Sequence, residues 1–120
     1  MILKNCCLKF LGDVKIMLTF NVKKEWFEKI KSGEKTHEYR ERTDYWYRRL
    51  FYYWYKTEYK EFFDDKETIC FACGYPKKDD KEKRLYAKVK SVTITYGKYT
   101  DLKINNPVFD IEFELIKENL

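Results

Sequence analysis

Short stretches of alternating apolar and polar residues recur along this chain and indicate a fold rich in β-strands. In residues 15–22 and 109–115 the apolar side chains occupy every second position. This period of two is typical of a strand with one buried and one solvated face. Residues 35–42, 68–74 and 85–90 are predicted to be three further strands, although the first of these is mostly charged. We therefore expect a sheet of about five strands.

A short helix is expected between the first two strands. Trp26, Phe27 and Ile30 form an apolar stripe at helical spacing. Asn21 can cap the start of this helix, and Gly33 can end it because glycine readily adopts a left-handed backbone conformation. Strands and helices in this order predict an α+β fold, a small mixed β-barrel of about five strands flanked by helices.

The length and the cysteines restrict the class of protein. At 120 residues the chain is long enough for one hydrophobic core, so we expect a single domain. No apolar run approaches a membrane span of roughly 18 residues, and no secretory signal precedes the cysteines, so we expect reduced thiols in a cytoplasmic protein. Cys70 and Cys73 offer half of a zinc site, but a second pair of ligands is missing and His37 is the single histidine. We predict neither a metal nor a cofactor.

The segment from Gly33 to Glu41 carries charges where a half-buried strand would carry an apolar face. Alternation places Glu38 and Arg40 on one face, close enough to pair or to share a ligand. The opposite face is expected to carry Lys35, His37, Tyr39 and Glu41. A strand that is polar on both faces is not ordinary core, so we expect it to line a site. The alternative is a solvated edge strand whose charges deter aggregation.

This segment resembles the hallmark of the ASCH domain, a small family within the PUA-like superfamily. The hallmark is a G-x-K-x-x-E-x-R run after the first helix, and its four named positions are Gly33, Lys35, Glu38 and Arg40. The likeness continues through residues 22–30, 70–75 and 84–89. It implies that residues 15–120 form one ASCH domain with a PUA-like β-barrel. Residues 1–14 fit the pattern poorly and are interpreted as an N-terminal extension or the result of a misassigned start.

The resemblance implies that the chain binds RNA or a nucleotide in a cleft between the barrel and the first helices. By position, Lys35 is expected to contact an anionic or carbonyl group, and Arg40 a phosphate. Glu38 is the natural partner for the exocyclic amine of cytosine or adenine, or for Arg40 itself. Three aromatic residues are candidates to stack on the base: Tyr39, Trp46 and Tyr75. His37 is a further candidate, although it is expected opposite Glu38.

The resemblance leaves an enzyme open in two forms. Some small ASCH proteins are similar to amidohydrolases that deacylate N4-acylated cytidine with the motif lysine, a threonine three residues later and a downstream glutamate. Lys35 is present here, but Glu38 occupies the threonine position, and a carboxylate is a poor substitute for a hydroxyl nucleophile. Other relatives resemble ribonucleases, for which Lys35, Glu38 and Arg40 can supply a general acid, a general base and a cation.

A third interpretation is a protein-interaction module formed by the segment Tyr45–Phe63, which contains eleven aromatic residues. Their spacing predicts one long helix or two short ones. Most of the rings are expected in the core, but interleaved lysines and arginines also allow stacking on bases and pairing with phosphates. Tyrosine, tryptophan and arginine are also the residue types that dominate the hot spots of protein interfaces. The net charge of +5 is compatible with a polyanionic ligand.

Overall fold

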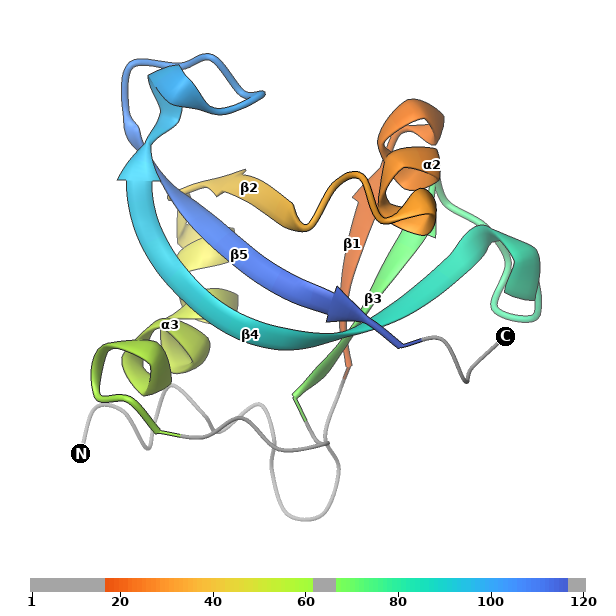
Figure 1. The fold of residues 1–120 in the computed structure, drawn as a ribbon, viewed down its shortest axis with the longest axis horizontal. Coiled ribbons are helices and arrows are strands. Elements are labelled where there is room, and N and C mark those ends of the chain that lie inside the picture. The colour runs from red at the N-terminus through yellow and green to blue at the C-terminus, as the bar shows by residue number, and fades with distance from the viewer. Residues whose placement is uncertain (1–16, 62–66, 117–120) are drawn as a thin grey trace.

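The computed structural model describes residues 17–61 and 67–116, and the secondary structure within them matches the expected α+β class (Figure 1). The elements, in chain order, are β1 (Leu18–Val22), α2 (Lys24–Ser32), β2 (His37–Glu41), α3 (Asp44–Glu58), β3 (Thr68–Cys73), the 3-10 turn η2 (Lys81–Lys83), β4 (Arg84–Tyr96), the 3-10 turn η3 (Gly97–Tyr99) and β5 (Pro107–Leu115). The five predicted strands are confirmed. The expected extension over residues 1–14 and the end of the aromatic segment, Phe62 and Phe63, lie outside the described residues.

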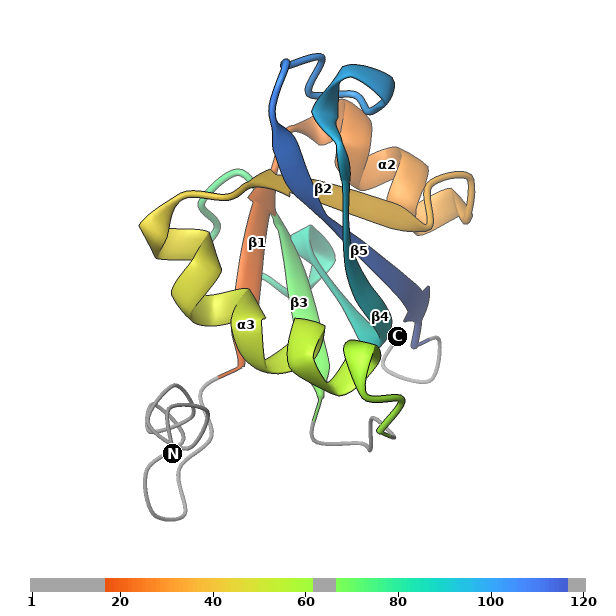
Figure 2. The same ribbon diagram turned by 90° about the vertical axis from the view of Figure 1, so that its left-hand side faces the viewer.

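The strands form one curled sheet in the order β1-β3-β4-β5-β2, which bends into a half-barrel (Figure 2). β1 runs parallel to β3, and the other neighbouring strands are antiparallel. β4 is the longest strand, and its register with β5 shifts between Val89 and Ser91, where the extra residue adds to the bend. As a result of the curl, β1 and β2, the two edges of the sheet, lie within side-chain reach of each other.

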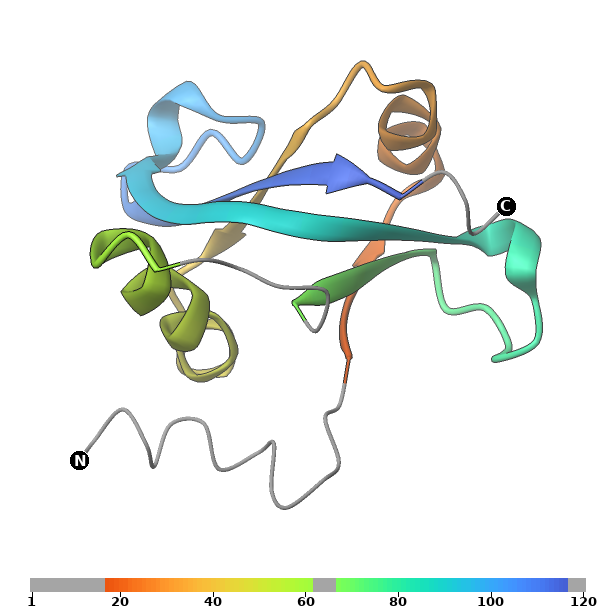
Figure 3. The same cartoon turned by 60° about the horizontal axis from the view of Figure 1, so that its bottom comes forward.

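The hydrophobic core is made by the inward side chains of the sheet together with one face of each helix. α2 contributes Phe27 and Ile30, and α3 contributes Leu50 and Tyr53. The strands supply Phe20, Val22, Ile69, Phe71, Leu85, Ala87, Val89, Val92, Phe109, Ile111 and Phe113. The two helices lie at opposite ends of the half-barrel, as Figure 3 shows. This arrangement leaves the motif strand β2 between them at one sheet edge.

Specific residues begin and end the two helices. Gly33 ends α2 with a φ of 89°, and its N–H donates to the carbonyl of Ile30, as expected. The predicted cap by Asn21 is wrong: Asn21 belongs to β1, and Lys23 occupies the N-cap position without a side-chain hydrogen bond. The aromatic segment forms one helix over its described part. It begins after Thr43, whose hydroxyl oxygen accepts a hydrogen bond from the N–H of Trp46.

The helices of residues 17–61 and 67–116 are too short and too polar for any of them to cross a membrane.

Candidate functional site

Four charged residues meet beside the motif strand and are called here the β2 charge cluster: Lys35, Glu38, Arg40 and Asp101. Lys35 lies between α2 and β2, where its N–H donates to the carbonyl of Lys29 at 3.0 Å. Its Nζ lies 2.6 Å from Oδ2 of Asp101 and 3.6 Å from Oε1 of Glu38. The expectation that Lys35 faces away from Glu38 is wrong. Because Lys35 precedes β2, the alternation of the strand does not fix its direction.

Glu38 and Arg40 pair on one face of β2, as predicted from their spacing. Nε and Nη2 of Arg40 donate to Oε2 of Glu38 at 3.0 and 2.7 Å. Nη2 also donates to the backbone carbonyl of Asn21 in β1 at 3.0 Å. The guanidinium carbon lies 4.9 Å from the ring centroid of Trp46 and 5.2 Å from that of Phe20. Arg40 therefore connects the two edges of the sheet.

Burial makes Glu38 the most unusual charge of the cluster. The residue is only 7% exposed. Burial raises the pKa of its carboxyl above the ordinary value, while the nearby charges of Arg40 and Lys35 act in the opposite direction. A buried carboxyl of this kind holds a proton more readily than an exposed one. Perturbed carboxyl pKa values are concentrated at functional sites, where such groups act as general acids or bases.

Two aromatic rings flank the ammonium of Lys35. Its Nζ lies 5.0 Å from the ring centroid of Trp26 and 5.3 Å from that of Tyr39, within the range of cation–π attraction. Burial raises the pKa of the Tyr39 phenol, and the carboxylates of Asp110, Asp101 and Glu38 raise it further. The phenol therefore remains protonated at neutral pH and can act as a hydrogen-bond donor.

His37 lies on the other face of β2, as predicted. Its Nδ1 is 2.6 Å from Oδ1 of Asp110 on β5, and its ring stacks on Tyr39 with centroids 6.3 Å apart. The carboxylate fixes the orientation of the imidazole. His37 contacts none of Lys35, Glu38 and Arg40. Of the residues around the cluster, it contacts Tyr39.

The structure brings five of the six predicted ligand-binding residues together. Lys35, Glu38 and Arg40 form the cluster, and Tyr39 and Trp46 pack against its two cations. Tyr75 is separate from the cluster. It follows β3, is 89% exposed and lines a hollow that no residue of the β2 charge cluster lines. One face of Trp46 is also covered, because its ring stacks on Phe20 with centroids 5.0 Å apart.

Sequence reasoning missed Asp101 and underrated Trp26. Asp101 lies in the turn that follows η3, 66 residues after the lysine it pairs with. An acidic residue in a loop carries no spacing signal, so only the fold reveals this contact. Trp26 was assigned to the apolar stripe of a helix, whereas its ring also faces Lys35. The half-buried position of Trp26, between core and solvent, is the feature that separates it from Phe27 and Ile30.

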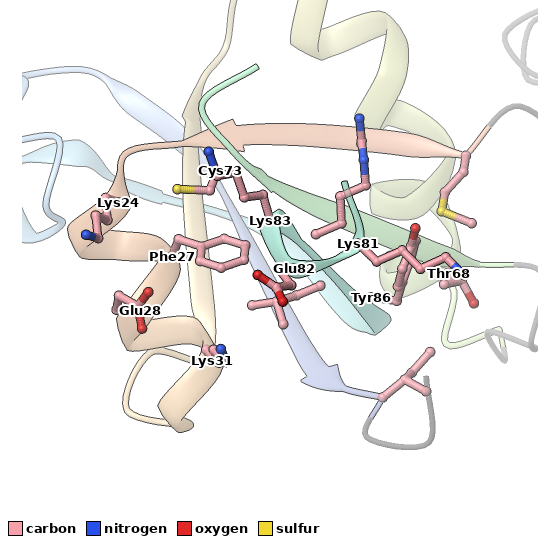
Figure 4. A pocket seen from close by; sticks show the side chains of 14 residues that line it. Lys24, Phe27, Glu28, Lys31, Thr68, Cys73, Lys81, Glu82, Lys83 and Tyr86 are labelled. Carbon is pink, nitrogen blue, oxygen red and sulfur yellow. The ribbon is translucent and has the colours of Figure 1, made fainter. Parts of the chain in front are cut away.

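Two hollows lie elsewhere on the surface of the protein. The larger, of about 1290 Å³, lies between α2 and η2 (Figure 4). The smaller, of about 550 Å³, lies beside β1 and the loop after β3. Neither hollow is lined by a side chain of the β2 charge cluster.

Residues 17–61 and 67–116 contain no cluster of three histidine, cysteine or acidic side chains able to hold a metal ion. Burial raises the pKa of the Cys70 thiol, although Arg84 beside it acts in the opposite direction, so this thiol is a weak nucleophile at neutral pH. Comparison of the chain with protein-family models, curated proteins and solved structures found no match. The function is therefore inferred from the geometry of the side chains.

Proposed function

We propose that this protein is an ASCH domain of the PUA-like superfamily that binds RNA or a nucleotide at the β2 charge cluster. The observation that carries the proposal is the burial of Glu38 between two cations and beside aromatic rings. Burying ionisable groups is costly unless each is paired, and such groups are concentrated at functional sites. The curled five-stranded sheet with its two helices supports the PUA-like assignment.

The two carboxylate oxygens of Glu38 have different partners in the cluster. Oε2 already accepts both hydrogen bonds from Arg40. Among the described residues, Oε1 has only the longer contact of 3.6 Å with Lys35, so it is the oxygen that we assign to an exocyclic amine of cytosine or adenine. Lys35 can then contact a carbonyl or phosphate oxygen of the same ligand, and Tyr39 or Trp26 can stack on the base.

Arg40 has a different role from the one expected for it by position. Two of its nitrogen atoms are engaged by Glu38 and Asn21, and its guanidinium lies beside the stacked rings of Trp46 and Phe20. We infer that Arg40 mainly holds Glu38 in place. Within the described part of the chain, its Nη1 makes no hydrogen bond and is the nitrogen that remains for a phosphate.

The proposal is tested by fluorescence anisotropy with labelled single-stranded RNA and by competition with cytidine and adenosine monophosphates. Glu38→Gln keeps the shape of the side chain but puts an amide, which can donate as well as accept, in place of the carboxylate. It is expected to weaken binding about tenfold, consistent with a loss of 1–3 kcal/mol for a base contact. Lys35→Ala is expected to weaken binding as well.

Lys29→Ala is the matched control, because Lys29 is near Lys35 but pairs with the exposed Glu34 at 3.8 Å. Its affinity is expected to equal that of the wild type. Wild-type affinity in Glu38→Gln and Lys35→Ala would place the ligand elsewhere and reject the β2 charge cluster as the site.

The enzyme interpretation has one observation in its favour, the contact of 2.6 Å between Lys35 and Asp101. It provides a downstream carboxylate beside the motif lysine, although this residue is an aspartate and the resemblance to amidohydrolases implies a glutamate. No hydroxyl of the described residues donates to or accepts from Lys35, and Glu38 stands at the threonine position. A hydrolytic reaction here would therefore use water, with Glu38 as its general base.

Turnover is tested by incubating the protein with single-stranded RNA and N4-acetylcytidine and following both by mass spectrometry. Free cytidine or shortened RNA that disappears in Lys35→Ala would establish an amidohydrolase or a ribonuclease. Intact substrates with measurable binding would establish a binding module.

The interaction-module interpretation has the outer face of α3 in its favour. Tyr47, Phe51, Tyr55 and Tyr59 contact one another in sequence along the helix, with ring centroids between 4.6 and 6.4 Å apart. Tyr47 and Tyr59 are exposed. Sedimentation at increasing concentration tests self-association through this face, and Tyr59→Ser is expected to abolish any association that it causes.

A further inference from the structure

The two hollows adjoin each other, and neither is lined by the β2 charge cluster. Their walls share Met17, Arg84 and Tyr86, so the hollows adjoin. One face of α2 provides a wall of the larger hollow through Lys24, Phe27, Glu28 and Lys31, which recur at helical spacing. Trp26 on the other face contacts Lys35 instead. The two hollows together are called here the α2–η2 groove.

The groove gathers far more positive than negative charge. The cations in its walls are Lys24, Lys31, Lys78, Lys81, Lys83 and Arg84, and the carboxylates are Glu28 and Glu82. Figure 4 shows lysines of α2 on one side of the larger hollow and Lys81 on the other, with Phe27 directed between them. Cations on facing walls repel one another, and a bound polyanion removes that repulsion.

The lysines of the groove lack ion-pair partners among the described residues. None of the five forms an ion pair with another side chain in residues 17–61 and 67–116. In contrast, Lys29, Lys35 and Lys56 all do. Arg84, shared by both hollows, has a buried Nε that no acceptor of the described residues meets. Within the described residues, the positive charge of the groove is therefore offset only by the nearby carboxylates of Glu28 and Glu82.

Aromatic rings, one of them largely exposed, accompany these cations. Tyr75 is 89% exposed in the wall of the smaller hollow, next to Lys78. Tyr86 lies at the junction of the two hollows, and Phe27 and Leu85 form an apolar floor in the larger one. Rings interleaved with cations along an open groove are suited to stacked bases joined by phosphates.

We propose that the α2–η2 groove is a second binding site, which takes the phosphodiester backbone of single-stranded RNA and stacks a base on Tyr75. Its cations are spread over two hollows, which suits several phosphates of one strand better than the single phosphate of a nucleotide. The inference rests on the proposed function for the choice of RNA. It depends on different residues, because no side chain of the β2 charge cluster lines the groove.

The test measures the affinity for labelled single-stranded RNA of about 12 nucleotides over a series of salt concentrations. Lys81→Gln/Lys83→Gln removes two cations from η2 without touching the core, since both side chains are exposed. The logarithm of the association constant falls linearly with the logarithm of the salt concentration. The slope of this line is expected to become shallower by about 1.4, or about 0.7 for each lost phosphate contact on a single strand. Tyr75→Ala is expected to weaken binding about tenfold, with the slope unchanged.

Lys90→Gln/Lys98→Gln is the matched control, with the same loss of charge at two exposed positions outside the groove. It is expected to leave the slope at the wild-type value. An equal decrease of slope in the control and in Lys81→Gln/Lys83→Gln would show that only net charge matters and would overturn the proposal.

The remaining outcomes separate this inference from the proposed function. If Glu38→Gln loses affinity while the η2 and Tyr75 variants bind as the wild type does, the β2 charge cluster stands and the groove is rejected. If the groove variants lose affinity and Glu38→Gln does not, the groove stands and the cluster is rejected. Equal affinity for a mononucleotide and for the longer strand rejects a strand-binding groove. No RNA binding by the wild type rejects the groove, and binding of neither RNA nor a mononucleotide rejects both sites.

Discussion

Arg40 of β2 donates a hydrogen bond to the backbone carbonyl of Asn21 in β1 and so joins the two edges of the curled sheet. The same guanidinium holds the buried carboxylate of Glu38 through two further hydrogen bonds. The geometry of the candidate site and the closure of the fold therefore depend on one side chain. A change at this position is expected to alter both stability and ligand binding.

Arg40→Lys is expected to lower the free energy of unfolding by about 1–3 kcal/mol although the charge is kept. An ammonium cannot reproduce the planar fork that donates to Glu38 and to Asn21 together, nor its contacts with the rings of Trp46 and Phe20. Urea denaturation measures the loss. Arg42→Lys, at an exposed position just after β2, is the control and is expected to change stability by less than about 0.5 kcal/mol. Equal effects of the two substitutions would contradict the bridging role.

The pKa of Glu38 predicts a specific pH dependence of stability. Because burial raises the folded-state pKa above the ordinary value of 4.5, the folded protein keeps a proton that the unfolded chain releases. The stabilisation from this proton is fully present below pH 4.5 and is lost as the pH rises through the folded-state pKa. The free energy of unfolding of the wild type, minus that of Glu38→Gln, should therefore decrease as the pH increases from 4.5 through the folded-state pKa of Glu38. Urea denaturation at a series of pH values measures it, and a difference that grows with pH would be inconsistent with the raised pKa.

The ion pair of Lys35 and Asp101 is expected to have a coupling energy of about 1 kcal/mol in a double-mutant cycle. The side chains are 10% and 27% exposed, so solvent screens them only in part. The cycle uses Lys35→Met, Asp101→Asn and the double variant. The pair of Lys29 and Glu34, at 42% and 67% exposure, is the matched comparison and is expected to couple by less than about 0.5 kcal/mol. If the exposed pair couples as strongly, Asp101 does not hold Lys35 in place.

Gly97→Ala is expected to disturb the turn that carries Asp101. A Cβ at Gly97 would lie 2.7 Å from both the backbone oxygen of Asn106 and Cγ1 of Ile104. The resulting shift is expected to cost about 1–3 kcal/mol of unfolding free energy. It should also reduce the coupling between Lys35 and Asp101, measured by repeating the cycle in this background. Full coupling would show that the turn adapts without moving Asp101.

The strands were predictable because their alternation is local, but their limits and their order were not. β4 extends to Tyr96, beyond the predicted residue 90. The shift in register between Val89 and Ser91 explains the difference: Val89 and Val92 are both buried, and a spacing of three breaks the period of two. The placement of β2 at the edge beyond β5 depends on contacts between distant segments, which a period in the sequence does not encode.

In the candidate site too, contacts within one strand were predictable from the sequence and contacts between distant segments were not. The pairing of Glu38 with Arg40 was predictable because both lie on one face of a single strand. Asn21 lies on the edge strand that the curl of the sheet brings to β2, and Asp101 lies in the turn that leads into β5, the neighbour of β2. Tyr75 was grouped with the motif for its chemistry alone, and the fold places it beside Lys78 and Arg84 instead.

The parallel pairing of β1 with β3 determines when the fold can be completed during synthesis. β1 leaves the ribosome first, but its neighbour in the sheet is made only after two helices and β2. Until then, the hydrogen-bonding groups of β1 have no strand to pair with, and its apolar side chains lack their cover. The sheet therefore cannot assemble in the order of translation, because β1 gains its hydrogen-bonded neighbour only after β3 has been made.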